Sequence, residues 1–343
     1  MNASKIEMSD REKIIKLLRE GERFNLVSHQ LPDGDNIGSL LALGEALERA
    51  GKEVQLFVPG GVPRRYRFLK GSEKIQPEMR SGQDWPMVVL DSSDLERTAN
   101  FQEQIRQAKI IINIDHHVTN ERFGTLNLVD PGAAATGEII YLLLKEMEAE
   151  ITRDMALALY VAISTDTGSF KFENTTPRTH RVAAELLEYK LNPAVISQRV
   201  FDERPYPFFR LLERALAGLE LHHGGKIACI TLSSAMLEEC GALPEDLEGL
   251  INYTRNIEGV ELGIMFFIES PEEVKVGFRT KTVDAARLAG LFNGGGHPRA
   301  AGCRLRGRPE EIKERVLREA AKLLEEGSRS DKESDDARNS ESQ

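Results

Sequence analysis

Residues 112–117 have the sequence Ile112-Asn113-Ile114-Asp115-His116-His117, an apolar run that ends in one carboxylate and two imidazoles. A short apolar run of this kind is typical of a buried strand. The acid and the two histidines then stand at the carboxyl end of that strand. We therefore predict a strand that presents metal-binding side chains at its tip.

Three other segments of the first half have the same form, in which an apolar run ends in acidic side chains. They are Leu26 to Asp35, with His29, Asp33 and Asp35 in its second part, then Val88-Val89-Leu90-Asp91, and Ser164-Thr165-Asp166-Thr167-Gly168 after an apolar helix. Gly34 is expected to let the backbone turn between Asp33 and Asp35.

Strands alternate with helices along this half of the chain. Strands are expected near residues 24–29, 54–58, 87–90 and 109–114, and helices near residues 11–19, 37–50, 134–146 and 154–163. That order predicts an α/β fold with a mainly parallel, doubly wound sheet. Because ligands bind at the carboxyl ends of strands in such sheets, we expect the four acidic segments to meet at one edge. Asp10 is expected to cap the first helix.

The second half predicts a smaller α/β domain with a mixed sheet, and a cleft between the two domains. Its expected elements are strands near 226–232 and 303–306, a hairpin of 260–268 and 274–280, helices near 244–255 and 283–292, a Gly-rich loop, and a last helix to residue 326. The expected domains are a catalytic domain at 1–190, a helical linker at 191–222, a substrate domain at 223–327 and a disordered tail at 328–343. His222-His223, which precedes two glycines, is interpreted as a polar linker and not as a metal site.

The composition is that of a globular protein, with 343 residues, 41% hydrophobic and 29% charged. A net charge of −10 argues against a charge-driven grip on long duplex nucleic acid, whereas a short anionic substrate needs only local positive charge. The three cysteines are odd in number and widely spaced, which predicts no disulfide framework and favours the cytoplasm. The apolar runs are too short to span a membrane.

The gathered carboxylates predict divalent cations, because acids crowded at one sheet edge would otherwise repel each other and resist ionisation. Mixed imidazole and carboxylate ligands suit manganese best, with magnesium, cobalt, iron or zinc as alternatives. Each motif also has an ordinary interpretation. Asp-Gly-Asp is common in turns, His-His pairs occur in cores, and Asp166-Thr167-Gly168 can end a helix. The four segments favour a metal site only when taken together.

At these residues the chain resembles the DHH phosphoesterase superfamily, which is named for a motif like Asp115-His116-His117. Three further segments resemble other motifs of that family: His29 to Ser39, Asp91 to Asp94, and Thr165 to Phe170. Gly294 to Gly302 resembles the signature of the associated substrate domain. The resemblance covers about residues 10–325, and this combination is similar to bacterial enzymes that act on nanoRNA and pAp. One departure is Asn36, where the family pattern leads us to expect a small residue.

The resemblance implies a site for two metal ions. His29 and Asp33 would hold one ion, Asp35, His116 and Asp166 the other, and Asp91 would bridge both. Asp115 would orient the neighbouring histidine, and His117 would face the substrate phosphate, so the implied catalytic residues are Asp91, Asp115, His116 and His117.

The implied reaction is attack on phosphorus by a hydroxide that two metal ions generate from water. The implied substrates are short oligoribonucleotides, cleaved to mononucleotides, and 3′-phosphoadenosine 5′-phosphate, which loses its 3′-phosphate. The alternatives are a phosphodiesterase for linear or cyclic dinucleotides such as pApA or cyclic di-AMP, a manganese inorganic pyrophosphatase, and a nucleotide sensor without activity. A homodimer is also compatible with the resemblance.

The second half must supply the grip on an anionic substrate that the acidic first half lacks. Cations, amides and a Gly-rich segment with exposed backbone N–H groups are suited to phosphate. The expected substrate contacts, besides His117, are Asn252, Arg255, Arg279, Lys281, Gly295, Gly296 and His297.

Overall fold

The computed structural model describes residues 8–30, 32–79 and 84–340, with residues 297 and 327–340 described by their backbone alone. The chain forms two compact units, Met1–Glu203 and Arg204–Gln343. The division falls inside the segment 191–222 that the sequence predicts to be a linker.

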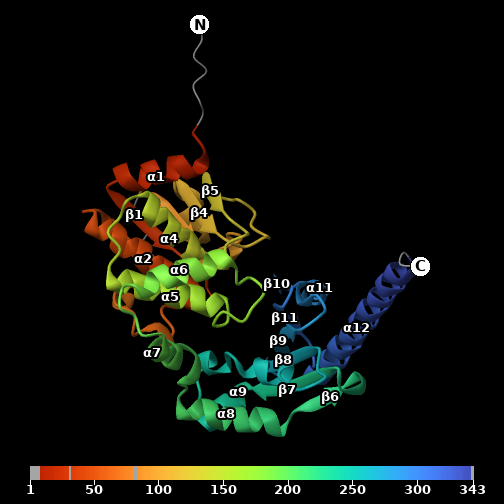
Figure 1. Ribbon diagram of the computed structural model, residues 1–343. Coiled ribbons are helices and arrows are strands. Elements are labelled where there is room, and N and C mark those ends of the chain that lie inside the picture. Colours follow the sequence, from red (N-terminus) through yellow and green to blue (C-terminus); the bar gives the residue numbers. More distant parts are fainter. Residues whose placement is uncertain (1–7, 31, 80–83, 341–343) are drawn as a thin grey trace. The chain divides into compact units, whose positions relative to one another are not determined.

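The first unit is built on a parallel sheet of five strands in the order β2-β1-β3-β4-β5. Three of these strands, β1, β4 and β5, are labelled in Figure 1. The strands are β1 (Arg23–Val27), β2 (Glu53–Phe57), β3 (Met87–Leu90), β4 (Ile111–Asp115) and β5 (Leu126–Val129). Its helices are α1 (Asp10–Glu20), α2 (Gly34–Arg49), α3 (Gln102–Gln107), α4 (Thr136–Glu146), α5 (Arg153–Asp166), α6 (Pro177–Leu187) and α7 (Pro193–Ser197). The parallel α/β architecture predicted from the sequence is confirmed, with β5 as an additional edge strand.

Both faces of this sheet are covered, which explains why its strands read as continuous apolar runs. Leu26, Val88 and Ile112 share one row of the sheet and belong to the larger core together with residues of α1, α2 and α4. Val27 and Val89 face the other way and pack in a smaller core with Phe101 and Ile105. The carboxyl ends of the central strands are therefore fixed from two sides.

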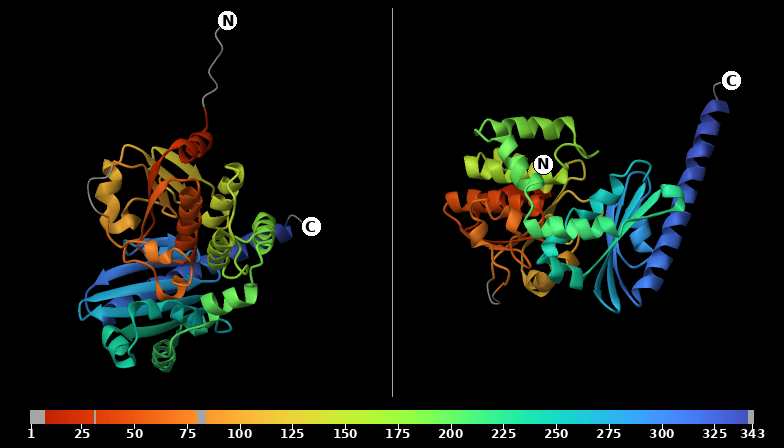
Figure 2. Two further views of the ribbon diagram at one scale, coloured as in Figure 1. Left: turned by 90° about the vertical axis from the view of Figure 1, so that its left-hand side faces the viewer. Right: turned by 90° about the horizontal axis from the view of Figure 1, so that it is seen from below.

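Helices α2 and α5 lie against each other, with backbone in direct contact (Figure 2). A Cβ on Gly38 of α2 would lie 2.2 Å from the carbonyl oxygen of Ala158 in α5. Only glycine permits this approach, because any side chain would push the two helices apart.

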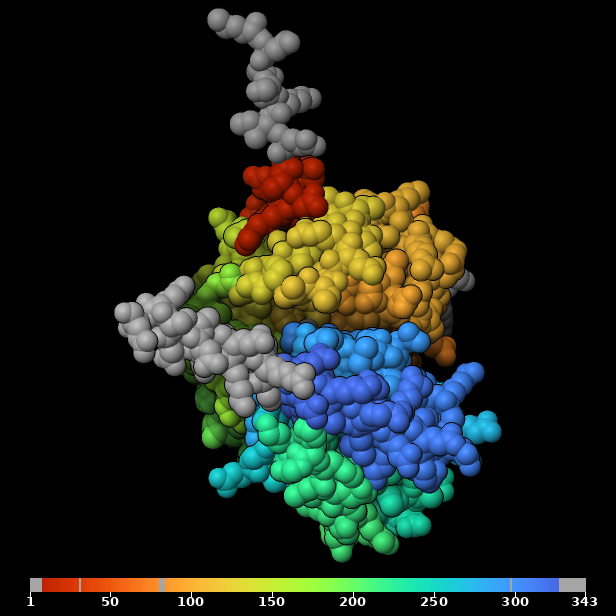
Figure 3. All heavy atoms as spheres, turned by 90° about the vertical axis from the view of Figure 1, so that its right-hand side faces the viewer, coloured from red at the N-terminus to blue at the C-terminus, as the bar shows by residue number. Residues whose placement is uncertain are grey.

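Helix α1 lies on the outside of the unit beside β5 (Figure 3). Its N-cap is Ser9, which forms a capping box with Glu12, so the prediction that Asp10 caps the helix is wrong. The Asp10 carboxylate instead accepts a hydrogen bond of 3.0 Å from the backbone N–H of Asn127 in β5. This acid therefore ties the helix to the sheet edge.

The second unit is built on a mixed sheet of six strands in the order β10-β11-β9-β8-β7-β6, in which only the β7–β8 pair is parallel. The strands are β6 (Glu220–His222), β7 (Ile227–Ser233), β8 (Leu262–Ser270), β9 (Glu273–Thr280), β10 (Gly295–His297) and β11 (Ala300–Arg306). Its helices are α8 (Tyr206–Ala217), α9 (Ser234–Cys240), α10 (Leu250–Arg255), α11 (Ala285–Gly290) and α12 (Pro309–Ser340). Residues of α11 and α12 join one core of the sheet, and residues of α8 and α9 join the other.

Three local expectations for this unit are wrong. The segment 244–255 is not one helix, because Gly249 adopts a left-handed backbone (φ 88°) between a 3₁₀ turn at Pro244–Leu247 and α10. The expected Gly-rich loop is the strand β10, which pairs with β11. Helix α12 continues through residues 328–340, where we predicted disorder, and residues 341–343 lie outside the described residues. Eight of those 13 residues are Ser, Asp or Asn, which have low helix propensity, so the composition does not explain this helix. Within the described ranges, no helix combines the length and the apolar character that crossing a bilayer requires.

Candidate active site

Three adjacent parallel strands deliver their acids and histidines to one edge of the first sheet. His29 follows β1, Asp91 follows β3, and Asp115 is the last residue of β4, directly before His116 and His117. Since β1, β3 and β4 are neighbours, these side chains meet at the carboxyl end of the sheet. The structure thus brings together side chains that are up to 88 positions apart in the chain, from His29 to His117.

The start of helix α2 places two more carboxylates at this edge. Asp33 is the N-cap and accepts a hydrogen bond of 3.0 Å from the backbone N–H of Asn36, and Asp35 lies in the first turn. The helix begins at Gly34, three residues before the predicted start. Gly34 has no positive φ, so the expected turn between the carboxylates is wrong. A Cβ on this glycine would lie 2.4 Å from the side chain of Thr165, so Gly34 is needed for close packing of α2 against the end of α5.

Asp91 lies at the centre of the cluster, with one carboxylate oxygen near His29 and the other near His116. Its Oδ2 is 3.1 Å from Nε2 of His29, and its Oδ1 is 3.6 Å from Nε2 of His116. Asp91 has a left-handed backbone with φ 56°, which is uncommon for a residue other than glycine and clusters at functional sites. This backbone turns the carboxylate back toward both histidines.

Two groups of candidate ligands therefore lie side by side. The first group is His29, Asp33 and Asp91, and the second is Asp35, His116 and Asp166; in each, one candidate ligand atom per residue lies within 4.8 Å of the others. A third combination of Asp91, His116 and His117 meets the same limit. All six metal ligands expected from the sequence are thus gathered at one place, with Asp91 near His116 of the second group.

The Asp35 carboxylate is anchored by the beginning of helix α4. Its Oδ2 accepts a hydrogen bond of 2.7 Å from the N–H of Thr136, and its Oδ1 accepts one of 2.8 Å from the N–H of Gly137. Ser39 Oγ donates a third bond of 3.0 Å. A helix N-terminus favours an anion, so α4 fixes this carboxylate in place.

Burial and mutual repulsion oppose ionisation of the acids in the second group. Burial, together with the charges of Asp91 and Asp166, raises the pKa of Asp35 well above its ordinary value. Burial and the charges of Asp33 and Asp91 do the same to the pKa of Asp166. Positive charge placed among these carboxylates would favour their ionised form.

The imidazoles supply part of that positive charge. Burial opposes ionisation of Asp91, but the hydrogen bond from His29 and the charges of His117 and His116 outweigh it and hold the pKa of Asp91 below its ordinary value. Burial opposes protonation of His116, yet Asp91, Asp35 and Asp115 raise its pKa.

Asp115 orients His117. Its Oδ1 accepts a hydrogen bond of 2.6 Å from Nδ1 of His117, and its Oδ2 accepts one of 2.5 Å from the side-chain amide of Asn120. His116 has a different partner, because its Nδ1 is 3.4 Å from the carbonyl oxygen of Ala133. The family resemblance implied that Asp115 orients the neighbouring, metal-binding histidine. That expectation is wrong, because the carboxylate bonds to His117, the second of the pair.

Arg97 is a residue of this site that the sequence did not reveal. Its guanidinium Nη1 lies 2.9 Å from Nε2 of His117, and its charge offsets part of the rise that burial and the neighbouring acids cause in the pKa of Asp166. Asp94 accepts a hydrogen bond from the backbone N–H of Arg97 and so fixes the turn that carries it. A lone arginine in a polar segment gives no signal of its own; its only marker was its position three residues after Asp94.

In the second unit the expected substrate contacts come from α10, β9 and the β10–β11 hairpin. Asn252 and Arg255 lie on α10, and burial together with the charge of Arg255 lowers the pKa of Arg279 in β9. Within the described part of the chain, neither Arg255 nor Arg279 has a carboxylate partner. Two guanidinium groups this close without a counter-charge favour an anion.

The hairpin lies beside these arginines. Arg279 is paired with Ala300, and Ala300 with His297, so residues 279, 300 and 297 occupy one row of three strands. Gly295 and Gly296 are exposed, and a Cβ on Gly296, whose φ is 143°, would lie 2.6 Å from the carbonyl oxygen of Ala300. Lys281 is exposed and donates a hydrogen bond of 3.3 Å to the carbonyl oxygen of Ile257.

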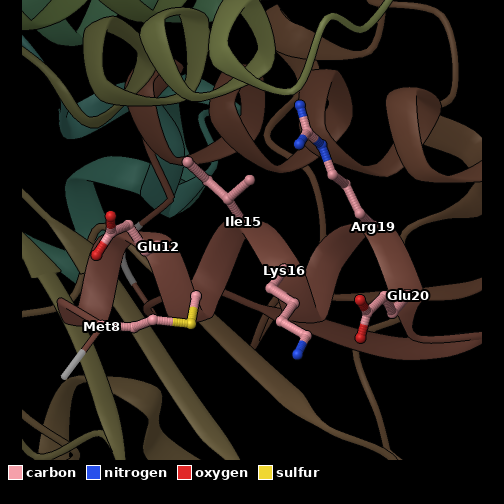
Figure 4. Close-up of a pocket in the computed structure, with 6 residues that line it drawn as sticks. All are labelled: Met8, Glu12, Ile15, Lys16, Arg19 and Glu20. Carbon is pink, nitrogen blue, oxygen red and sulfur yellow. The ribbon is translucent and has the colours of Figure 1, made fainter. Parts of the chain in front are cut away.

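A separate pocket lies along α1 and contains none of these residues (Figure 4). It is lined by Met8, Glu12, Ile15, Lys16, Arg19 and Glu20. With one helix and no convergent polar groups, it is a surface depression.

Comparison with known proteins gives the same assignment across most of the chain. Residues 23–163 match the DHH family, N-terminal domain, and residues 228–326 match the DHHA1 domain. The chain is 38% identical over 295 residues to the bifunctional oligoribonuclease and PAP phosphatase NrnA of Thermus thermophilus, covering 85% of this chain and 87% of that protein. It is 29% identical to the Bacillus subtilis protein of the same name, covering 84% and 91%.

A solved structure has the same fold. The exopolyphosphatase-related protein from Bacteroides fragilis superposes with a TM-score of 0.85 at 26% identity, covering 92% of this chain and 97% of that one. With acids and histidines gathered at the ends of β1, β3 and β4, and both domains matched in order, the chain belongs to the DHH family of phosphoesterases.

Proposed function

We propose that this chain is a metal-dependent phosphohydrolase that cleaves short oligoribonucleotides to mononucleotides and removes the 3′-phosphate of 3′-phosphoadenosine 5′-phosphate. The observation that carries the proposal is the position of Asp91, whose two oxygens face the two histidines His29 and His116. A shared carboxylate between two ligand groups is suited to two ions that act on one phosphate. The names of the Thermus and Bacillus relatives support these substrates.

The donor set fits two divalent cations. Asp35 and Asp91 are 1% and 2% exposed, and buried carboxylates in such numbers need cations. We propose that His29, Asp33 and Asp91 hold one ion and that Asp35, His116 and Asp166, with Asp91, hold the other. Manganese suits these oxygen and nitrogen donors, with magnesium or cobalt as alternatives. When bound, such ions supply an activated water for attack on phosphorus.

Residues beside the metal ligands would donate hydrogen bonds to the phosphoryl group. In the free protein Nε2 of His117 accepts a hydrogen bond from Arg97. We propose that the guanidinium turns to the phosphoryl oxygens when substrate binds, so that Nε2 can take up a proton and donate to a phosphoryl or leaving oxygen, while Asp115 holds Nδ1 and stabilises the positive charge of the ring. Arg97, 2.9 Å from that Nε2, adds a second donor for the same oxygens. Fixed donors that meet developing negative charge lower the barrier to phosphoryl transfer.

The second unit would bind the rest of the substrate. We propose that Arg255 and Arg279 bind a phosphate, with Asn252 and Lys281 nearby on the same unit, and that the N–H groups of Gly295 and Gly296 and the imidazole of His297 contribute further donors. Such a grip serves a short anionic chain with few phosphates. Two further parts of this proposal are action in the cytoplasm, which rests on the three scattered cysteines, and a homodimer, which rests on the family resemblance.

The experiment is a comparison of substrates on one preparation. The purified protein is stripped with EDTA, given back manganese, and offered 3′-phosphoadenosine 5′-phosphate, a series of di- to pentaribonucleotides, pApA, cyclic di-AMP and pyrophosphate. We expect manganese-dependent release of phosphate from the first and of mononucleotides from the series. The Asp91→Asn protein, which keeps the shape of the side chain, should be inactive on both.

Other outcomes would replace the proposal. Rapid hydrolysis of pyrophosphate alone would assign the chain to the pyrophosphatases. Activity confined to pApA or cyclic di-AMP would assign it to the dinucleotide phosphodiesterases. Binding of nucleotides without turnover of any substrate would identify a sensor.

A further inference from the structure

A second cluster of metal-binding side chains lies in the other unit, at the edge of the six-stranded sheet. Strand β6 is the edge strand and lies beside β7 (Figure 1). The two strands pair in antiparallel register, with Glu220 opposite Cys229 and His222 opposite Ile227. Residues paired in this way point to the same face, and so do residues two positions apart on one strand. Glu220, His222 and Cys229 therefore share one face.

The three side chains converge on that face. One candidate ligand atom from each lies within 4.8 Å of the other two. Nε2 of His222 is 3.2 Å from Oε2 of Glu220. Two ligands of one tetrahedral zinc ion, with bonds of about 2.0 Å, are separated by about 3.3 Å. The carboxylate and the imidazole are thus already placed as such a pair.

The donor types select a different ion from that of the first unit. Cysteine occurs only at positions 229, 240 and 303, all beyond the first unit, so the acid and histidine cluster has no sulfur donor. A thiolate with an imidazole and a carboxylate suits zinc, whereas oxygen-rich sets suit manganese or magnesium. With three protein donors, a zinc ion keeps one position open for water.

The graded exposure of the cluster gives an ion access from solvent. The side chain of Glu220 is 45% exposed and that of His222 is 33% exposed, while Cys229 is fully buried at the base. Burial raises the pKa of the Cys229 thiol to about 11, so this cysteine is inert until a metal takes the place of its proton.

Helix α12 supplies a competitor for the same carboxylate. Nζ of Lys313 lies 2.5 Å from Oε1 of Glu220, while Oε2 of that acid faces His222. One oxygen is therefore held by the ammonium group and the other is directed toward the imidazole. The lysine lowers the affinity for a cation but leaves one oxygen available.

We infer that Glu220, His222 and Cys229 form a second metal site, specific for zinc-like ions, that ties the edge strand β6 to β7. It lies on the face of the sheet covered by α12. Arg279, paired with Gly263 and through it aligned with Ala228, points to the opposite face. The inference does not depend on the proposed reaction.

The test uses cobalt as a spectroscopic probe for zinc. The full-length protein is stripped of metal, saturated with manganese to fill the acid and histidine cluster, and titrated with Co²⁺. A bond between cobalt and a thiolate produces an intense near-ultraviolet charge-transfer band, which ligands without sulfur cannot produce. We expect this band to reach a plateau at the intensity of one cobalt–thiolate bond and to disappear when Zn²⁺ is added; cobalt that displaces manganese from the other cluster adds nothing to it, because that cluster has no sulfur donor.

Variants assign the band to residues. Cys229→Ser should abolish it, and His222→Ala, at a half-exposed position that tolerates truncation, should weaken cobalt binding at least about tenfold. Cys303→Ser is the matched control, because Cys303 packs against the same core but without His222 or Glu220 beside it, and it should leave the titration unchanged. Lys313→Gln should tighten binding, because the competing ammonium is removed.

Three results would overturn the inference. They are the absence of a charge-transfer band in the wild-type protein, a band that persists in both Cys229→Ser and His222→Ala, and weaker cobalt binding in Lys313→Gln. Circular dichroism of each variant establishes that it is folded.

Discussion

Asp115 Oδ1 accepts a hydrogen bond of 2.6 Å from Nδ1 of His117, although the two residues are only two positions apart in the chain. The bond directs Nε2 of the ring toward the guanidinium of Arg97. It therefore fixes both the tautomer and the direction of the imidazole that we assign to the substrate phosphate.

Asp115→Asn tests this arrangement. The amide cannot stabilise a positively charged ring as the carboxylate does, so we expect kcat to fall about 10- to 100-fold while the metal content stays unchanged. Turnover on 3′-phosphoadenosine 5′-phosphate and metal analysis of the same sample measure the two quantities. Loss of metal from this variant would mean that Asp115 supports the ligands and not His117.

Asp166→Asn tests the repulsion among the acids. The folded-state pKa of Asp166 lies well above its unfolded value of about 3.9. The folded protein therefore binds more protons than the unfolded protein between these two pH values, and the stability of the metal-free protein is lost as the pH rises through the folded pKa. We expect the metal-free variant to melt above the metal-free wild type at neutral pH, and the difference to vanish below about pH 4.

Manganese should reverse that order. Added Mn²⁺ should raise the melting temperature of the wild type more at neutral than at acidic pH, and should raise that of Asp166→Asn much less. Scanning calorimetry with and without Mn²⁺ across the pH range measures both effects. A metal-free variant that melts below the wild type at neutral pH would show that Asp166 is stabilising without an ion.

Arg279→Gln tests the anion site of the second unit. A charge-assisted hydrogen bond to a phosphate contributes about 1.5–3 kcal/mol, so we expect kcat/KM to fall about 10- to 100-fold, mainly through KM. Metal content should be unchanged, because Arg279 belongs to the other unit. Arg304→Gln is a matched control on the same sheet; its side chain pairs with Glu269 and Glu273, and it should leave KM as it is. A fall in bound manganese in Arg279→Gln would contradict the assignment.

Asn36→Ala tests the departure from the family pattern. Asn36 is fully buried, and neither its amide oxygen nor its amide nitrogen has a hydrogen-bond partner within the described residues. A buried amide without partners costs about 1–3 kcal/mol, and alanine also has the higher helix propensity. We expect the free energy of unfolding to rise by about 1 kcal/mol, since the smaller side chain leaves some space unfilled.

Urea denaturation of the metal-free protein measures this change. Ser39→Ala is the control on the same helix, because it removes a polar side chain that does have a partner. Ser39 donates a hydrogen bond to Asp35, so its replacement should not raise the free energy of unfolding and should reduce activity. A destabilised Asn36→Ala protein would show that the amide has a role that its contacts do not reveal.

The sequence predicts the strands of the first unit well because each apolar run is short, buried on both faces and followed by a change to polar residues. Val88 to Leu90 is an example, since the strand ends where Asp91 begins. The parallel order then places the acidic segments together. Patterns of this kind concern the backbone and the sheet, and they do not resolve which atoms touch.

What the sequence did not predict depends on contacts between distant residues. The role of Gly34 follows from Thr165, which is 131 positions away, and the pairing of Gly295 to His297 follows from β11. Arg97 contributes through one hydrogen bond to His117, and no periodicity marks such a residue. His222 is part of a strand and not of a linker. The sequence did not predict this strand, because β6 is short and Leu221 is its only apolar residue.

The close contact between Gly38 and Ala158 fixes the distance between two parts of the proposed metal site. Asp33 and Asp35 move with α2, while Asp166 moves with α5, and these helices touch through the missing side chain of Gly38. A single methyl group at residue 38 would increase the distance between two sets of ligands that it does not itself contact. The distance between the two helix backbones thus limits the ionic radius that the proposed site accepts. We expect replacement of Gly38 to shift the preference among divalent metals toward larger ions before it abolishes binding.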